Sequence, residues 1–249
     1  MKNPHDDAAR WEDLARREPY FALRVDDDDA GVQSSGIAND AFFQTGEDDI
    51  SALFAAMTTL FSSDVRFDSV LDFGCGAGRL TLPLARRVQH VTACDVAPTM
   101  LLHARQKAER VGLHNVTFQS CDDALASGAS FDFVCSLLVF QYIPPSLGYG
   151  LIRSLTKQLN RDGVAALQLR LYGASKLHRF ASLGRGRRPF AFRTGSSRVP
   201  RSPPKFARIH RYDERLVARA VEAVGASVVA QLPADARRTD DAVLIVRKS

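Results

Sequence analysis

The chain has 249 residues, of which 45% are hydrophobic and 24% charged, so it can bury one sizeable core and is short for two equal domains. No apolar stretch approaches the roughly 20 residues that span a bilayer, and the polar start Met1–Asp7 lacks the apolar core of a signal peptide. These features argue against a membrane-spanning or secreted protein, and we expect a cytoplasmic one. The formal net charge of +5 is modest but unevenly distributed.

The cysteines are scattered without a Cys-x-x-Cys pair, and three of them fall in or beside expected buried strands. In such places cysteine behaves as a small apolar residue. We therefore expect neither a disulfide nor a metal site at Cys75, Cys94, Cys121 and Cys135.

The first 62 residues are expected to form an N-terminal helical arm ahead of a main domain at 63–249. Apolar residues at helical spacing from Ile50 to Phe61 predict an amphipathic cap helix. Thr45 and Gly46 are expected just before this helix, with the acids that follow them in its favoured first turn.

Two features of the arm allow more than one interpretation. The aromatic pair Phe42 and Phe43 is suited either to closing over a bound ligand or to packing against a sheet. The acidic run 26–29 is interpreted as a solvated loop, and the alternative is a catalytic role.

An apolar strand at Val70–Phe73 runs into three glycines and then into a helix expected at 79–87. The spacing Asp-x-Gly-x-Gly-x-Gly is tighter than the Gly-x-Gly-x-x-Gly fingerprint, which lays a diphosphate on a helix N-terminus. Because glycines let the backbone approach a ligand closely, the loop favours a smaller nucleoside cofactor; the alternative is a turn with no ligand. The candidate contacts are Asp72, Gly74, Cys75, Gly76 and Gly78.

A second short strand, His90–Asp95, ends in an acid about 20 residues beyond the glycines, where a ribose-binding carboxylate belongs. Asp95 and its neighbour Val96 are therefore expected in the cofactor site. The other role open to Asp95 is a helix N-cap, and both can hold at once. A third strand at 116–120 also ends in acids, and a buried fourth strand, 131–138, contains Leu137.

The rest of the chain continues the alternation of strands and helices. Helices are expected at 98–111, 146–159 and 213–224, and strands at 163–171, 227–232 and 241–246, with a helix-ending turn at 160–163. The pattern predicts an α/β fold, a doubly wound sheet of seven strands with helices on both faces and an antiparallel last pair. Ligands on such sheets bind beyond the carboxyl ends of the strands.

The loop from Asp72 to Gly78 resembles motif I of the class I S-adenosylmethionine-dependent methyltransferases, and Phe118-x-x-x-Asp122 and Phe131-Asp132-Phe133-Val134 extend the resemblance. It implies a Rossmann-like sheet of order 3-2-1-4-5-7-6 with the last strand antiparallel, and S-adenosylmethionine as cofactor with S-adenosylhomocysteine as product. Asp122 then accepts from the adenine amino group, with Asp123 as the fallback. Leu137, Thr45 and Gly46 are expected as further cofactor contacts.

The arm is similar to that of a group in which glycan-modifying members are common. The group's signature appears here as a Trp-x-x-Leu at Trp11, a Pro-aromatic pair at Pro19 and Phe-Phe-x-Thr-Gly at 42–46 in the arm, and as Phe-Gln-Tyr-Ile-Pro at 140–144 after the fourth strand. The resemblance therefore spans nearly the whole chain, although the arm is less specific than the glycine loop.

Between Arg170 and Arg211 there are twelve Lys or Arg residues and no Asp or Glu, interleaved with Gly, Ser and Pro. This basic insertion, set at 172–211, follows the fifth strand, where the family places substrate-recognition elements. Arg185, Arg187 and Arg188 are candidates for binding an anionic acceptor. The alternative is a solvated basic loop with no fixed ligand.

The expected chemistry is methyl transfer to an anionic small-molecule or glycan acceptor. The methyl group would go to a sugar hydroxyl or to a phosphate-bearing sugar. Candidate bases are His210 and His178, and Tyr142 is better suited to positioning, because its ordinary pKa is near 10. Gln141 is a candidate substrate contact. The alternative function is a nucleic-acid-binding methyltransferase, or an inactive binding module, that uses the basic segment. Against nucleic acid, Ser136-Leu137-Leu138-Val139 replaces the Asn-Pro-Pro-Tyr type of motif that base-amino methyltransferases carry.

Overall fold

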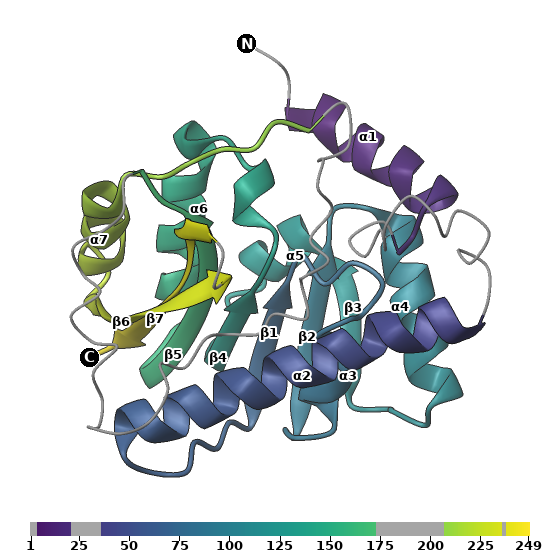
Figure 1. Cartoon of the computed structure of the whole chain (residues 1–249), viewed down its shortest axis with the longest axis horizontal. Coiled ribbons are helices and arrows are strands. Elements are labelled where there is room, and N and C mark those ends of the chain that lie inside the picture. Colours follow the sequence, from purple (N-terminus) through teal and green to yellow (C-terminus); the bar gives the residue numbers. More distant parts are fainter. Residues whose placement is uncertain (1–3, 21–35, 173–206, 236–237) are drawn as a thin grey trace.

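The computed structural model describes residues 4–20, 36–172, 207–235 and 238–249 as an α/β fold (Figure 1). The helices are α1 (Pro4–Arg17), α2 (Gly36–Phe61), α3 (Thr81–Ala85), α4 (Pro98–Arg110), α5 (Cys121–Ala126), α6 (Pro145–Lys157) and α7 (Glu214–Glu222), with a short 3-10 helix at Phe140–Tyr142. The strands are β1 (Ser69–Phe73), β2 (His90–Asp95), β3 (Val116–Ser120), β4 (Phe131–Ser136), β5 (Leu159–Arg170), β6 (Ala226–Asp235) and β7 (Arg238–Lys248).

All seven strands form one sheet of order β3-β2-β1-β4-β5-β7-β6. The first five strands pair in parallel, and β7 pairs antiparallel with both β5 and β6. The strand order and the antiparallel last strand expected from the sequence are therefore confirmed. Figure 1 shows α1 beyond the carboxyl ends of the central parallel strands, where such sheets bind their ligands.

Each face of the sheet carries its own apolar layer. Successive side chains of a strand point to opposite faces, so Leu71 packs in one layer and Val70 in the other. The first layer contains side chains of α6 and α7, and the second contains Ile50, Leu53 and Met57 of α2. The cap helix is thus part of the core that supports β1 and β4.

The start of α2 was wrongly predicted. The helix begins at Gly36, so Thr45, Gly46 and the acids after them lie in its interior rather than at its N-terminus. A glycine inside a helix is unfavourable by roughly 1 kcal/mol, but here a Cβ on Gly46 would lie 1.9 Å from the carbonyl oxygen of Arg79. The glycine lets α2 pack directly on the backbone that follows the glycine-rich loop.

Other boundaries also differ from the expectation. The helix predicted at 79–87 is only the short α3, which follows a turn-rich stretch. The turn predicted at 160–163 lies inside β5, whose register with β4 shifts at this point and where Asp162 has a φ of 62°. The sequence of this irregular strand start resembles that of a helix end, because both use residues such as Asn, Asp and Gly.

Within the described part of the chain, no helix is long and apolar enough to cross a membrane.

Candidate functional site

The three glycines of the loop after β1 have positive φ angles of 77°, 53° and 90° but do different work. A Cβ on Gly74 would lie 2.4 Å from a methyl carbon of Val139, and one on Gly78 would lie 3.2 Å from the Cβ of Ala104. A Cβ on Gly76 would meet nothing within 4 Å. Two of the glycines therefore allow close packing, and Gly76 presents backbone to open space.

That open space is a cavity of about 470 Å³ beyond the carboxyl ends of the central strands, within the size range of small-molecule sites. Most of the predicted site residues line it. These are Asp72, Gly74, Cys75, Gly76, Asp95, Val96, Asp122, Leu137, Gln141 and Tyr142.

The remaining predicted residues fall outside the lining. Gly78 packs on α4, and Thr45 and Gly46 lie behind the loop in α2. Asp123 donates its backbone N–H to the Ser120 hydroxyl at 3.0 Å and takes part in the N-terminal cap of α5. Of the two neighbouring acids, Asp122 is the one at the cavity. The cofactor roles of the four residues outside the lining remain predictions.

Asp95 is tied to the backbone at both oxygens. One oxygen accepts from the Gly76 N–H at 2.9 Å and the other from the Ala97 N–H at 2.9 Å. Burial raises the pKa of Asp95, and these bonds to the backbone oppose the rise. The N-cap position of α4 is Ala97 rather than Asp95, so the aspartate shapes the turn before the helix and bridges it to the glycine loop.

Asp72 is 1% exposed, and its carboxylate accepts from the Thr81 hydroxyl at 2.6 Å. Burial raises the pKa of Asp72 to about 6, because a low-dielectric surrounding disfavours the charged form. The cavity thus holds a buried acid, Asp72, and a partly buried one, Asp95, each of them fixed by hydrogen bonds.

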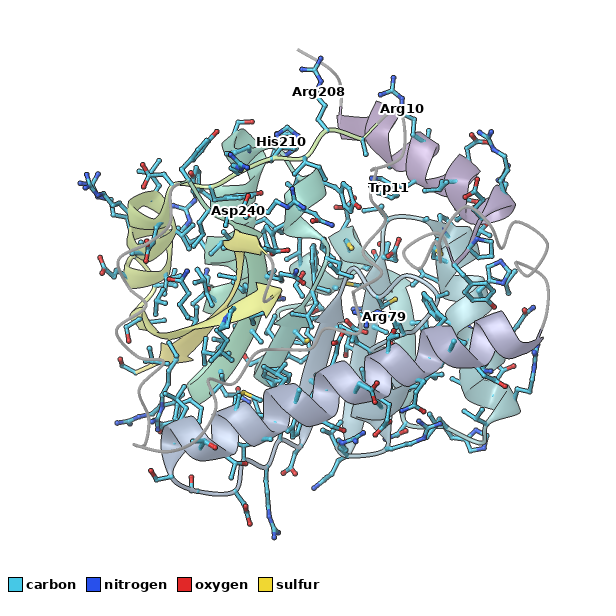
Figure 2. The ribbon with its side chains drawn as sticks, viewed as in Figure 1. Arg10, Trp11, Arg79, Arg208, His210 and Asp240 are labelled. Atoms are coloured by element: carbon cyan, nitrogen blue, oxygen red, sulfur yellow. The ribbon has the colours of Figure 1, made fainter. Side chains whose placement is uncertain are left out.

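Arg79 is a cavity residue that the sequence analysis missed. Its guanidinium lies 2.5 Å from Asp49 and 3.5 Å from the Thr45 hydroxyl, and the residue is 8% exposed. Figure 2 shows Arg79 between α2 and the strands. Thr45 therefore supports the site through Arg79. The available signal was an arginine directly after the third glycine, but its partner on α2 is 30 residues away in sequence.

The arm α1 closes one side of the cavity, and Ala8 and Trp11 are in its lining. The Trp11 ring meets the Tyr142 ring edge-on at a centroid distance of 5.1 Å. On the same helix, the Glu12 carboxylate accepts from the Thr99 N–H at 3.0 Å and from its hydroxyl at 2.5 Å. Since Ala97 has no side-chain cap of its own, Glu12 caps α4 from another helix, a contact that the sequence did not reveal.

The two predicted catalytic residues, Tyr142 and His210, are placed differently. Tyr142 lines the cavity, and burial raises its pKa to about 12, so the phenol keeps its proton at neutral pH. His210 is half-buried and outside the lining, but its backbone N–H donates to the carbonyl of the cavity residue Gln141 at 2.8 Å. Its catalytic role remains a prediction.

His178, Arg185, Arg187 and Arg188 lie outside the described residues. The chain on either side of that segment is described. Tyr172 donates its N–H to the carbonyl of Tyr212 at 2.9 Å, and Leu171 bridges to Tyr212. Figure 2 shows Arg208 and His210 at the end of the molecule where α1 carries Arg10. Residues 172 and 212 therefore adjoin, near one side of the cavity.

The strand order, the glycine loop and the cavity at the carboxyl edge define a class I S-adenosylmethionine-dependent methyltransferase fold. Residues 70–163 match the family model described as a methyltransferase domain. The chain thus carries a methyltransferase domain of the class I type.

Solved structures support the same fold. Magnesium protoporphyrin IX methyltransferase from Synechocystis PCC 6803, crystallised with S-adenosylmethionine, has a TM-score of 0.62 and 21% identity, with all of both chains covered. The N-methyltransferase NodS from Bradyrhizobium japonicum, in complex with S-adenosylhomocysteine, has a TM-score of 0.52 and 16% identity over 95% of this chain and 97% of that one.

Curated relatives match over shorter segments. A ubiquinone biosynthesis O-methyltransferase from Methylocella silvestris is 40% identical over 81 residues, 32% of either chain. A 23S rRNA (uracil(1939)-C(5))-methyltransferase from Salmonella choleraesuis is 50% identical over 56 residues, 22% of this chain and 13% of that protein. The matched segments therefore span from about an eighth to a third of these relatives.

Proposed function

We propose that this chain binds S-adenosylmethionine at the carboxyl edge of its sheet and transfers the methyl group to a small-molecule acceptor. The observation that carries the proposal is the cavity in which Asp95, the open side of Gly76 and the buried Arg79 converge. The family match at residues 70–163 agrees with it.

The residues present fit this cofactor. Both oxygens of Asp95 accept from the backbone, and a carboxylate has lone pairs enough to accept from a ribose hydroxyl as well. Gly76 leaves room for close approach of the ligand, and the Arg79 guanidinium is suited to the carboxylate of the amino-acid portion. Asp122, which also lines the cavity, is suited to the adenine amino group.

When bound, the cofactor supplies an electrophilic methyl group on a sulfonium, and the residues of this chain contribute orientation and proximity. Trp11 and Tyr142 together exclude water from one side of the cavity. With its raised pKa, Tyr142 acts as a hydrogen-bond donor that positions the acceptor rather than as a base. His210 is the candidate base for an acceptor hydroxyl that reaches past Gln141 toward the 207–212 segment.

An anionic acceptor, such as a phosphate-bearing sugar or another glycan, is the finer part of the proposal. It is supported by the excess of Lys and Arg between residues 170 and 211 and by the meeting of Tyr172 and Tyr212 close to Gln141. Arg10 and Arg208 add positive charge at the same end of the molecule (Figure 2). Arginine binds phosphates and carboxylates through a fixed fork of donors.

Calorimetric titration with S-adenosylmethionine tests the cofactor site. Asp95→Ala is expected to weaken binding by about 1 to 3 kcal/mol, because ribose hydroxyls lose a charged acceptor. Gly76→Val is expected to abolish measurable binding, because the branched side chain would fill the cavity and its φ of 53° is unfavourable for valine. Gly112→Val is the matched control, a glycine of φ 72° whose Cβ also meets nothing within 4 Å and which does not line the cavity. Equal micromolar binding by wild type and both site variants would refute the assignment.

Replacing Arg185, Arg187 and Arg188 together by Ser tests the acceptor. Cofactor affinity is expected to stay unchanged while the acceptor KM rises, each lost charged hydrogen bond being worth roughly 1.5 to 3 kcal/mol when well formed. An unchanged KM would support the solvated-loop interpretation instead.

The competing candidate is a nucleic-acid methyltransferase, which the basic segment and the partial match to the rRNA enzyme favour. Nucleic-acid binding falls steeply with salt, whereas binding of a small cofactor in this cavity is expected to respond weakly. Salt-sensitive RNA or DNA binding, lost in the triple variant together with methylation of that nucleic acid, would replace the small-molecule proposal.

A further inference from the structure

The chain turns sharply directly after β4, at the wall of the cavity. Leu138 has a φ of 63°, and Leu137, Leu138 and Val139 all line the cavity. A leucine rarely adopts this left-handed conformation, and such a residue persists only where its surroundings enforce it. Neighbouring groups must therefore hold Leu138 in this conformation.

Two buried polar side chains from the other half of the sheet hold it. The Leu138 N–H donates to the side-chain oxygen of Gln168 at 3.1 Å, and the side-chain nitrogen of Gln168 donates to Asp241 at 3.0 Å. Gln168 on β5 is 3% exposed, and Asp241 on β7 is 4% exposed. Polar groups buried this deeply in a sheet are unfavourable unless they are paired.

The order of donors and acceptors gives each residue a distinct part. A carboxylate only accepts, so Asp241 fixes the amide nitrogen of Gln168 on its own side and leaves the amide oxygen facing Leu138. The backbone N–H of Leu138 only donates, so it can pair with the amide oxygen of Gln168 and not with the amide nitrogen. Asp241 thus sets the direction of the amide, and the amide in turn holds the turn.

The position of this turn also affects the glycine loop. A Cβ on Gly74 would lie 2.4 Å from Val139, so these two segments are already in close contact. A change in the conformation of Leu138 would move Val139, the next residue, and with it the packing against Gly74. The cavity wall and the loop that opposes it are therefore set together.

We propose that Gln168 and Asp241 are positioning residues that hold Leu138 in its left-handed conformation and so fix the wall that residues 137–139 give to the cavity. The proposal rests on the proposed function in that S-adenosylhomocysteine, the product form of the cofactor, is the ligand used to measure the cavity.

An exchange of the two polar groups tests the proposal. In Gln168→Glu with Asp241→Asn, the glutamate still accepts from the Leu138 N–H, and the asparagine amide donates to its second oxygen. Affinity for S-adenosylhomocysteine, measured by calorimetry, is expected to stay within about threefold of wild type, since both hydrogen bonds are retained. Gln168→Glu alone places two carboxylates about 3.0 Å apart and is expected to bind at least about tenfold more weakly.

Gln168→Met keeps the length of the side chain and removes both hydrogen bonds. It is expected to weaken binding about tenfold or more, because the Leu138 N–H loses its acceptor. Gln231→Met on the edge strand β6 is the matched control, and it is expected to leave binding unchanged. Amide hydrogen exchange at Leu138 is the second readout: slow in wild type and in the exchanged pair, and fast in Gln168→Met.

Each result decides the matter. Folded Gln168→Met that binds as wild type does, or an exchanged pair that folds but stays as weak as Gln168→Glu, would overturn the proposal. If Gln168→Met does not fold, the comparison of Gln168→Glu with the exchanged pair decides. If wild type does not bind the ligand at all, the proposed function fails, while Leu138 exchange still tests the positioning: unchanged protection in Gln168→Met overturns it, and protection lost there and restored in the exchanged pair supports it.

Discussion

Two parts of the cavity are formed in different ways. The cofactor edge contains Asp72, Gly76, Asp95 and Asp122, and the rim contains residues of α1 and of the segment 137–144. The edge comes from consecutive strand–turn–helix units between residues 70 and 126, each of which brings its own glycine or acid to the carboxyl end of a strand. The rim depends on contacts between distant parts of the chain, such as Glu12 with Thr99, 87 residues apart, and Gln168 with Asp241, 73 residues apart. A short motif can therefore specify the edge, whereas the rim exists only once the whole chain has folded.

At the cofactor edge, the largest expected effect comes from Asp72. Burial of its charged carboxylate is expected to lower the free energy of unfolding. An acid whose pKa is higher in the folded state holds its proton more tightly there, so its favourable contribution is present below the unfolded pKa of 3.8 and is lost as the pH rises to about 6. In denaturant titrations, Asp72→Asn is expected to gain about 2 kcal/mol relative to wild type as the pH rises from 4 to 7, which is most of the roughly 3 kcal/mol that the full pKa shift is worth.

Asp72→Asn is also expected to bind S-adenosylmethionine more weakly, which would mean that the buried charge is retained for the ligand. A stability difference that does not change with pH would contradict the pKa assigned to Asp72. Unchanged affinity would show that the edge does not need this charge.

Two glycines on α6 test the contact between this helix and Tyr212. A Cβ on Gly148 would lie 2.1 Å from the hydroxyl oxygen of Tyr212, which donates to the Ile143 carbonyl at 2.7 Å, whereas a Cβ on Gly150 would meet nothing within 4 Å. Gly148→Ala is expected to lower the free energy of unfolding by about 1 to 3 kcal/mol through overpacking. Gly150→Ala is expected to raise it by roughly 0.5 to 1 kcal/mol. Urea unfolding measures both, and equal effects would show that α6 and Tyr212 are not in close contact.

Neighbouring acids on α1 give the smallest effect. Glu12 caps α4, whereas Asp13 pairs with Arg17 on the surface of its own helix. Glu12→Ala is expected to lower stability by about 1 kcal/mol, as the loss of a helix cap does, and to speed amide exchange at Thr99. Asp13→Ala is expected to stay within about 0.5 kcal/mol of wild type. Similar exchange at Thr99 in both variants would mean that α1 does not stabilise α4.

The sequence was sufficient for the edge because its signals are local. Glycine spacing, an acid at the end of each strand and alternation of strands with helices predicted the α/β sheet, and the resemblance to the class I methyltransferases implied its strand order. Together they predicted ten of the residues that line the cavity. Asp122 and Asp123 could be ranked because only one of them fits the pattern after β3, and Asp122 is the one in the cavity lining.

The contacts between distant segments could not be predicted from the sequence, because they depend on packing in the folded chain. Gly46 suggested a helix start, yet its purpose is the close approach of α2 to the Arg79 backbone. Arg79 and Glu12 are residue types common on protein surfaces. Nothing near them in the sequence indicates that Arg79 pairs with Asp49 or that Glu12 pairs with Thr99. Likewise, a glutamine within an apolar strand gave no indication that it would hold a turn on the neighbouring strand.

All four cysteines are free and buried, and Cys75 and Cys121 line the cavity. Burial raises the pKa of Cys75, Cys121 and Cys135 above the usual range for a thiol, although in Cys121 the thiol of Cys94 contributes most. Since the thiolate is the reactive form, thiol reagents should modify the native protein slowly and the unfolded chain fast. The cysteines are therefore natural chemical probes of local opening at this edge, and a ligand that fills the cavity should shield Cys75 and Cys121.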